Sequence, residues 1–594
     1  MEKKSYLKNL KIKAEGPIGK SKDFIEEEQL LDADLWKDCV NVFTNNCDDA
    51  DCGWRGEFWG KMLRGAALVY SVDKNPVLYE RMTETIQDLL VVEEKRGVLS
   101  SYSEEKQYSG WDLWSRKYVM LGLEYFLEVC EEEALRERII ACLMRQAKII
   151  MAHVGSGEEQ IPITKTSDIH GGMNSASILE PFAKLYGLTK DNTVKQFVEY
   201  IINTGACDSE NIFENAFQDE KFPYEYKEKK AYEMMSCFEG LLEYYKLTEK
   251  EKYLQSVVRF IDKMEQSEET VIGCLGCDTE YLDHAKETQT EFKDDVMQET
   301  CVTVTWMKLC YKVHKMTGDV KYIRYIDRSF YNAMYGAMNF VKLPIQLYLQ
   351  DGKIYMPVDS YAPLIERPRR SLIAGGKWVT PELLCGCCCS ISSAGIGIAG
   401  QNLLLRDGRG FVLNLYEKSI METTTPIGNS FILREETNYP REGKIKFELE
   451  LEKSEQFSLK FRIPEFGKHF TIAVNGEEVL MSPENDYVCI ERTWQSGDFV
   501  NLDIKYSFHE LSCNGKISYQ YGPFVLATDS SIGLSDVERE DETFTVGDKF
   551  FYKANLKNGC ESLCCFESDG KVYLDYASAG KNPSEESSLV TVWF

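Results

Sequence analysis

The first two-thirds of the chain repeats a helix–turn–helix unit of about 60 residues. Each unit ends in an aromatic or apolar pair and a short polar turn, as at residues 125–129, 184–189 and 244–248. This length accommodates two helices of three to five turns with their connections. Helical hairpins bury their apolar faces against one another, either in an open solenoid or in a closed ring. Because several connections begin with aromatic and polar clusters instead of uniform short turns, we expect an (α/α)6 barrel.

Near residue 405 the sequence changes from the helical period to alternation. Ile445 and Phe447 alternate with charged neighbours, and residues 457–463 repeat the pattern. A period of two is typical of strands with one buried face, and the Asn-Gly pair at 475–476 is a strong hairpin signal. We therefore expect antiparallel β-sandwich (jelly-roll) domains after the barrel.

The predicted organisation has four parts. Residues 1–20 form a strand segment that packs on the β region, and residues 21–405 form the barrel with the catalytic site. Residues 406–511 and 512–594 form two sandwiches, which we expect to serve as a structural platform without an active site.

The charge balance limits the partners of the protein. With 69 Lys and Arg against 96 Asp and Glu, the 594 residues carry a net charge of −27. Phosphate backbones require clustered cations, so we expect no nucleic-acid partner. No stretch approaches the ~20 apolar residues of a membrane-spanning helix, and no signal-peptide pattern follows Met1. We expect a cytoplasmic protein without a membrane partner, whose 20 cysteines are thiols or metal ligands.

Four of the cysteines fall within five residues, at Cys385, Cys387, Cys388 and Cys389. Adjacent thiols do not readily pair with one another, but they can present sulfur to one soft cation. Three thiolates with one nitrogen or oxygen ligand make a tetrahedral zinc site, and one short loop rarely supplies the whole shell. Glu299 and Cys301, at the start of a helical run, are the best further donors. A structural zinc knot and a redox cysteine pair are the alternatives to a catalytic centre.

The combination of Glu299-Thr300-Cys301 with Cys388-Cys389, on a helical barrel followed by β-sandwiches, resembles the β-L-arabinofuranosidases of glycoside hydrolase family 127. The resemblance extends over nearly the whole chain. The paired cysteines with Glu-x-Cys are specific, whereas the remaining motifs are supportive. These supportive motifs lie at residues 54–61, 110–112, 170–174, 231–234, 461–464 and 474–476.

The resemblance implies a zinc-bound cysteine that acts as nucleophile on an anomeric carbon. Carried over by position, zinc would be held by Glu299, Cys301, Cys388 and Cys389, and Cys388, the first cysteine of the pair, would be the nucleophile. Zinc coordination removes the thiol proton at neutral pH, and two successive displacements retain the anomeric configuration. We favour this register, but the adjacent Cys387 leaves open a second one in which the pair is Cys387-Cys388.

The resemblance also implies a glutamate acid/base on a loop upstream of Glu299. The loop at residues 284–292 contains two candidates. Glu287 is the first choice, because His284 lies three residues before it, and Glu291 is the second. Acid catalysis would require partial burial to raise the pKa of that glutamate towards neutrality, and a solvated surface loop is the alternative.

Aromatic and acidic residues in the supportive motifs are candidates for substrate binding. Aromatic rings stack on the C–H faces of sugars while carboxylates bind their hydroxyl groups. Core packing and helix capping are the alternatives for the same residues. With His284, the candidates are Glu57, Trp59, Trp111, Asp112, His170, Asn174, Tyr232 and Glu233.

The function expected from this resemblance is a retaining glycoside hydrolase that releases a terminal furanose-type sugar, β-L-arabinofuranose first among them. A cytoplasmic location would limit its substrates to small imported oligosaccharides or glycoconjugates. One rival is a glycosidase or lyase for an acidic or branched sugar, with a structural zinc. Another is a metal-stabilised carbohydrate-binding protein without catalysis. The oligomeric state stays open, a homodimer included.

Overall fold

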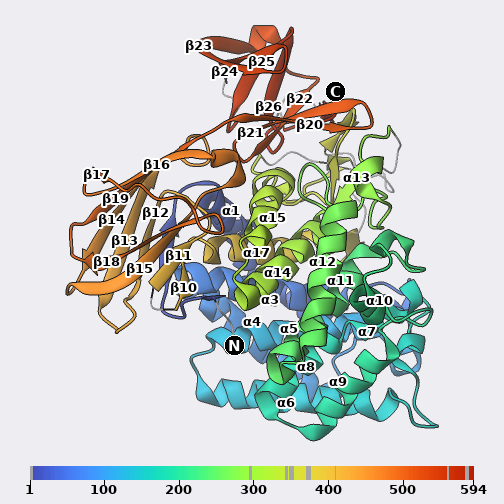
Figure 1. Ribbon diagram of the computed structural model, residues 1–594. Helices are drawn as coiled ribbons and strands as arrows, with labels where there is room; N and C mark the ends of the chain where they lie inside the picture. The colour runs from blue at the N-terminus through green and yellow to red at the C-terminus, as the bar shows by residue number, and fades with distance from the viewer. Residues whose placement is uncertain are drawn as a thin grey trace.

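The computed structural model describes residues 4–292, 297–341, 345–346, 353–369, 376–408, 410–557, 561–581 and 588–594. Within these ranges, six helices form an inner ring in which each helix contacts the next and the last contacts the first (Figure 1). In ring order they are α3 (Gly56–Asp73), α5 (Asp112–Val129), α8 (Leu179–Thr189), α11 (Ala231–Thr248), α14 (Thr300–Thr317) and α17 (Cys387–Gln401).

An outer layer of helices covers the ring, and each inner helix has an outer partner. Five partners follow their inner helices directly along the chain: α4 (Pro76–Arg96), α6 (Glu133–His153), α9 (Asn192–Thr204), α12 (Glu251–Ser267) and α15 (Lys321–Arg328). The sixth, α1 (Pro17–Ile25), packs on α17 from the N-terminal end of the chain. The structure thus confirms the predicted (α/α)6 barrel.

The two layers differ in how their side chains are buried. Helix α12 buries one face at helical spacing, with Val257, Phe260, Ile261 and Met264. Helix α3 is buried at every residue except Asp73, because it lies between the interior of the ring and the outer layer. Charged residues on inner helices are therefore held inside the protein, where an unpaired charge is costly.

Antiparallel sheets follow the barrel, which confirms the predicted fold class. One five-stranded sheet has the order β1-β10-β11-β15-β18 and one seven-stranded sheet has the order β17-β16-β19-β14-β13-β12-β2. Alternation of buried and exposed residues is clearest in β14 (Lys444–Leu451) and β15 (Glu455–Arg462). Among the paired strands described here, β11 (Gly410–Leu413) and β15 run parallel. The remaining strands are β10 (Leu405–Asp407), β12 (Ser419–Thr424), β13 (Ser430–Thr437), β16 (His469–Val474), β17 (Glu477–Glu478), β18 (Tyr487–Trp494) and β19 (Phe499–Lys505).

The N-terminal segment belongs to these sheets. Strand β1 (Lys4–Ser5) pairs with β10, and β2 (Lys11–Ala14) pairs with β12. The carboxylate of Glu417 then accepts hydrogen bonds from the backbone N–H groups of Gly16, Ile18 and Gly19. These bonds satisfy the first turn of α1 and tie the barrel to the first sandwich.

The last part of the chain forms a further sheet in the order β20-β21-β22-β26-β25-β24-β23. Strand β20 also lies against β23 at the far end of that order, so the sheet curls around its own core. Phe508, Tyr521 and Phe566 belong to the aromatic cluster inside it. The strands are β20 (Phe508–Cys513), β21 (Lys516–Tyr521), β22 (Phe524–Asp529), β23 (Val537–Val546), β24 (Lys549–Leu556), β25 (Cys565–Ser568) and β26 (Lys571–Asp575).

The described residues contain no helix that is both long enough and apolar enough to cross a membrane.

A buried histidine joins α14 to the first sandwich. His314 is fully buried; its Nδ1 lies 2.9 Å from the Asp319 carbonyl oxygen and its Nε2 lies 3.2 Å from Asn414 Nδ2. Since the Asn414 amide donates to Nε2, Nδ1 carries the proton and donates to the carbonyl. Burial lowers the pKa of His314 from 6.5 to about 4, so the imidazole is neutral in the folded protein at pH 7.

We expect this histidine to make the barrel sensitive to acid. The unfolded chain takes up the proton near pH 6.5 and the folded chain only near pH 4, so stability is lost as the pH falls through that window. The loss attributable to His314 is about 3 kcal/mol between pH 7 and pH 4. Between pH 7 and pH 4, the urea midpoint should fall less for His314→Gln than for wild type. An equal fall in both proteins would refute the role of His314.

Candidate active site

Four potential metal ligands meet at one end of the barrel. Ligand atoms of Glu299, Cys301, Cys387 and Cys388 all lie within 4.8 Å of one another. Glu299 precedes the first residue of α14, and Cys387 is the first residue of the neighbouring α17. Two adjacent inner helices therefore bring their N-termini, with their partial positive charge, to the same point.

Short strands hold these two helix starts in place. Strand β3 (Met297–Glu299) pairs with β6 (Tyr361–Pro363), so that Glu299 lies opposite Tyr361. Strand β9 (Leu384–Gly386) pairs with β8 (Gly376–Trp378) and leads directly into α17. The four side chains are thus positioned by regular backbone rather than by a free loop.

The chemistry of this donor set is compatible with a metal ion. Cys388 Sγ lies 3.6 Å from Glu299 Oε1 and 3.8 Å from Cys387 Sγ. The second carboxylate oxygen of Glu299, Oε2, is buried and has no hydrogen-bond partner among the described residues. An unpaired buried carboxylate oxygen is costly, and coordination would satisfy it. Three sulfurs and one carboxylate form a typical ligand set for a soft divalent metal.

Cys389 is not part of this cluster, which differs from the register favoured from the sequence. Its Sγ and its carbonyl oxygen lie 3.4 Å and 3.2 Å from the Gln29 side-chain nitrogen. Successive helical residues are rotated by about 100°, so three adjacent cysteines on a helix cannot all face one point. The two that face Glu299 and Cys301 are Cys387 and Cys388.

The two paired cysteines differ in accessibility. Cys388 is fully buried and also contacts the Ser360 carbonyl oxygen, whereas Cys387 is only half-buried. Hydrogen bonds from Cys301 and Cys388 hold the pKa of the Cys387 thiol well below its usual range. Burial raises the pKa of Cys388 instead. Cys387 is therefore the sulfur that is both anionic and open to an incoming molecule.

Lys61 and Glu57 form a buried hydrogen-bonded pair beside the cluster. Lys61 Nζ lies 2.9 Å from Glu57 Oε1 and 3.9 Å from Cys301 Sγ. The other Glu57 oxygen accepts a hydrogen bond from Trp114 Nε1, and the Lys61 ammonium lies over the Tyr232 ring at 4.7 Å. Burial raises the pKa of Glu57 to about 8, with Lys61 opposing the rise. Lys61 thus brings a positive charge towards the thiol cluster.

A second carboxylate, Glu280, contacts Tyr361 and Lys230 beside the cluster. Its Oε1 accepts a hydrogen bond of 2.6 Å from Tyr361, and its Oε2 pairs with Lys230. Lys230 also lies 3.9 Å from Glu233. Burial raises the pKa of Glu299, and the Glu280 charge is the next contribution to that rise, which places the two carboxylates close together. The Glu280 side chain is 24% exposed, so small molecules can reach it.

Aromatic rings from separate segments line the same end of the barrel. Trp111 contacts Trp54, Trp114 and His170, with ring centroids 5.7 to 6.0 Å apart. His170 in turn contacts Tyr281, next to Glu280. Burial lowers the pKa of His170, so its imidazole is neutral at pH 7. Rings and carboxylates together suit a ligand with both C–H faces and hydroxyl groups.

Five of the nine expected binding residues lie in these surroundings, namely Glu57, Trp111, His170, Tyr232 and Glu233. Three others make hydrogen bonds to neighbouring groups of the protein. Trp59 donates from Nε1 to Thr85 Oγ1 at 2.8 Å, between α3 and α4. Asp112 accepts from Ser100 and from the Tyr108 backbone. Asn174 donates to the Gly110 carbonyl oxygen at 2.9 Å.

The loop expected to carry the acid/base is engaged elsewhere. The Glu287 side chain is 65% exposed and lies 3.6 Å from His284, whose ring stacks on Tyr224 at 4.6 Å. The Glu287 carbonyl oxygen accepts from Asn514, in the turn after β20. Glu291 continues this loop, with its backbone N–H bonded to the Thr288 carbonyl oxygen. Glu287, the first choice, thus faces solvent beside the C-terminal sheet.

Sequence reasoning missed Lys61, Lys230, Glu280 and Tyr361. Lys61 had a signal, because it follows Glu57 by one helical turn inside the motif at residues 54–61. No sequence pattern pointed to Glu280, because only its contacts with Lys230 and Tyr361 distinguish it from other acidic residues of the loop.

Comparisons with known proteins identify the family to which this fold belongs. A family model described as the β-L-arabinofuranosidase GH127 catalytic domain matches residues 22–390, and the GH127 middle-domain model matches residues 410–506. Among curated proteins, none matches the chain.

Two solved structures are similar over nearly the whole chain. A GH127 β-L-arabinofuranosidase from Geobacillus stearothermophilus T6 is 17% identical with a TM-score of 0.71, covering 98% of this chain and 99% of its own. A GH127 β-arabinofuranosidase is 14% identical with a TM-score of 0.71, covering 100% of this chain and 98% of its own. At these identities the likeness shows a shared fold.

Proposed function

This chain belongs to glycoside hydrolase family 127 and is a glycoside hydrolase, and on that premise we propose that it releases a terminal β-L-arabinofuranose from small glycosides with retention of configuration. The choice of sugar follows the activity named for the family's catalytic domain and for the relative from Geobacillus stearothermophilus T6. The observation that carries the mechanism is the half-buried Cys387 sulfur at a helix N-terminus, between two other thiols and a carboxylate.

We infer that zinc is held by Glu299, Cys301, Cys387 and Cys388. The support is a set of three sulfurs and one carboxylate, together with the unpaired buried oxygen of Glu299. When bound, zinc keeps the coordinating thiols deprotonated at neutral pH. Because the paired cysteines are then Cys387 and Cys388, the proposed nucleophile is Cys387 rather than Cys388, the residue expected from the sequence.

In the first displacement, the Cys387 sulfur attacks the anomeric carbon and a C–S bond forms as the glycosidic C–O bond breaks. Glu280 donates a proton to the departing oxygen, which leaves as an alcohol. In the second, Glu280 takes a proton from water, the water oxygen attacks the same carbon, and the C–S electron pair returns to Cys387. Two inversions at one carbon give net retention.

Glu280 is the better acid/base because its surroundings orient it. The Tyr361 hydroxyl donates to one of its oxygens and the Lys230 ammonium pairs with the other. Both partners lie next to Glu299, since Tyr361 pairs with Glu299 across two strands and Glu299 contributes to the raised pKa of Lys230. A positioned carboxyl group beside the scissile bond is what general acid–base catalysis requires.

The sugar would be bound by groups around these two residues. We assign hydroxyl contacts to Glu233 and His170 and ring contacts to Trp111 and Tyr232. Glu233 Oε2 is buried without a hydrogen-bond partner among the described residues, so a sugar hydroxyl could donate to it.

Metal analysis gives the first test. We expect one zinc per chain, with X-ray absorption distances of about 2.3 Å to sulfur and about 2.0–2.2 Å to oxygen in a three-to-one ratio. A strong chelator should abolish activity, and zinc should restore it. Cys301→Ser should lose most of the metal, while Cys389→Ser keeps it. A shell of nitrogen and oxygen ligands alone would rule this centre out.

A further inference from the structure

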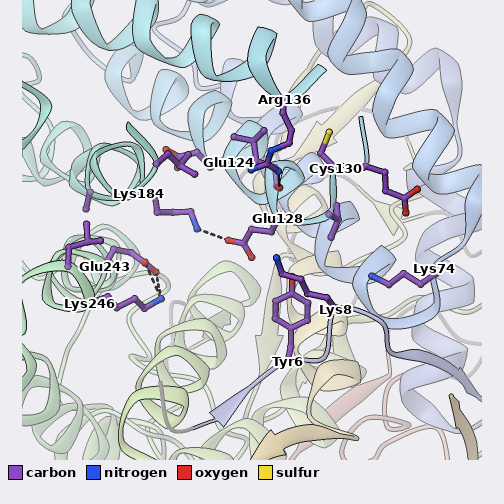
Figure 2. Close-up of a pocket in the computed structure, with 17 residues that line it drawn as sticks. Tyr6, Lys8, Lys74, Glu124, Glu128, Cys130, Arg136, Lys184, Glu243 and Lys246 are labelled. Atoms are coloured by element: carbon purple, nitrogen blue, oxygen red, sulfur yellow. Dashed lines mark hydrogen bonds and ion pairs between the residues drawn. The ribbon is translucent and has the colours of Figure 1, made fainter. Parts of the chain in front are cut away.

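The opposite end of the barrel contains a cavity of about 630 Å³ (Figure 2). The cluster lies where α14 and α17 begin, whereas this cavity is lined by residues at the ends of inner helices, including Lys74 after α3, Glu128 on α5 and Lys246 on α11. Tyr6 and Lys8 of the N-terminal segment line it as well. Its volume lies within the range of about 300–1,000 Å³ found for small-molecule sites.

One buried side chain in this cavity has no partner. Glu124 of α5 is 1% exposed, and neither of its carboxylate oxygens has a hydrogen-bond partner among the described residues. A buried polar group without a partner is costly, so the side chain calls for a hydrogen-bonding ligand. Burial also raises the pKa of Glu124 far above its ordinary value, so the group is neutral at pH 7. A neutral carboxyl offers an O–H donor beside a C=O acceptor.

Most charges around the cavity are already balanced within the protein. Lys184 pairs with Glu128 at 2.8 Å, and Lys246 pairs with Glu243 at 3.1 Å, as Figure 2 shows. Arg136 Nε lies 4.0 Å from Glu133 Oε2, and the guanidinium also donates to the Leu127 carbonyl oxygen. These pairs leave no strong excess of either sign for a ligand to neutralise.

Two further lysines stand at the rim. Lys8 is exposed, and the Lys74 ammonium lies over the Tyr70 ring at 5.0 Å. The carbonyl ends of α3, α5, α8 and α11 face the same space and carry a partial negative charge that offsets them. The cavity is thus polar but close to neutral, which favours an uncharged ligand.

Apolar side chains complete the lining. Leu127, Val129, Leu188 and Leu247 border the cavity beside the Tyr6 ring. A monosaccharide combines C–H faces, which suit this surface, with hydroxyl groups that can both donate and accept at Glu124. We propose that this cavity is a second binding site, separate from the cysteine cluster, for a neutral monosaccharide held by Glu124. The proposal does not rest on the proposed activity.

Equilibrium dialysis with labelled L-arabinose, D-xylose and D-galactose tests the site on the full chain. At least one sugar should bind to this site in addition to any bound at the cluster. Glu124→Leu should weaken this additional binding roughly tenfold or more, because both hydrogen bonds are lost. Glu124→Gln keeps a donor beside an acceptor and should bind within about threefold of wild type. The inhibition constant of the same sugar against glycoside hydrolysis should stay unchanged in both variants.

A second variant tests the site without a substitution in the buried core, in case Glu124→Leu disturbs folding. Leu188 is 42% exposed and lines the cavity, so Leu188→Trp should fill it from the rim and remove the additional binding without disturbing the core. Absence of additional binding for all three sugars would overturn the proposal. So would additional binding that survives both Glu124→Leu and Leu188→Trp, or a cavity that takes inorganic phosphate in preference to the sugars. Because dialysis measures binding, the result stands apart from whether the protein hydrolyses arabinofuranosides.

Discussion

Cys387→Ser is expected to lower kcat by about 10⁴-fold or more, because loss of a nucleophile removes the covalent route altogether. A serine hydroxyl is mostly protonated at neutral pH and cannot replace the thiolate that neighbouring thiols and cations stabilise. Steady-state kinetics on p-nitrophenyl β-L-arabinofuranoside measure the effect. Because Cys387 is also a proposed zinc ligand, bound zinc and the melting temperature should fall together with turnover, while the circular dichroism spectrum of the fold should be retained.

Cys389→Ser is the matched control, because Cys389 follows Cys388 on the same helix but lies outside the group formed by Glu299, Cys301, Cys387 and Cys388. Its sulfur contacts Gln29 rather than the cluster, so turnover should stay within a few fold of wild type. An inactive Cys389→Ser beside an active Cys387→Ser would restore the register in which Cys388 and Cys389 form the pair. It would also mean that α17 begins elsewhere than at Cys387.

Glu280→Gln should lower kcat/KM by about 10²–10⁴-fold on glycosides with poor leaving groups, because glutamine cannot donate a proton. An activated aryl glycoside needs less protonation, so its first step should be less affected. Its second step still lacks a base, and the glycosyl-enzyme should accumulate after an initial burst of nitrophenol. Stopped-flow measurements of the burst separate the two steps.

Glu287→Gln provides the comparison for this glutamate. Its carboxylate is exposed and faces His284, so activity on both substrates should stay near wild type. The reverse pattern, a normal Glu280→Gln with an inactive Glu287→Gln, would return the acid/base to the loop at residues 284–292. It would require that loop to move towards the cluster when substrate binds.

Much of the fold follows from the periodicity of the sequence. The repeated hairpins predict inner and outer helices because each hairpin has one face that it cannot bury alone, as α12 illustrates. Alternation in β14 and β15 likewise predicts strands. The position of α1 as the outer partner of α17 depends on contacts between opposite ends of the chain. No local pattern carries that information.

Some residues of the candidate site can likewise be predicted from the sequence, whereas others depend on the three-dimensional structure. Residue type and crowding identify the cysteine window and Glu299-Thr300-Cys301, because thiols are rarely clustered without a chemical reason. The register depends on where α17 begins, since one residue of shift turns each sulfur by about 100°. A triplet of identical residues gives no local means of fixing that start. Glu280 is recognised as a candidate only by its contacts with Lys230 and Tyr361, which lie 50 and 81 positions away in sequence.

The proposed mechanism requires the Cys387 sulfur to become covalently bound to the sugar during turnover. Mass spectrometry of the Glu280→Gln enzyme, quenched during the burst with p-nitrophenyl β-L-arabinofuranoside, tests it most directly. We expect one pentosyl unit on the peptide that contains residues 385–389, located on Cys387 by fragmentation. A pentosyl unit on Cys388 or Cys389, or hydrolysis by wild-type enzyme with inversion and no covalent adduct in either enzyme, would contradict it.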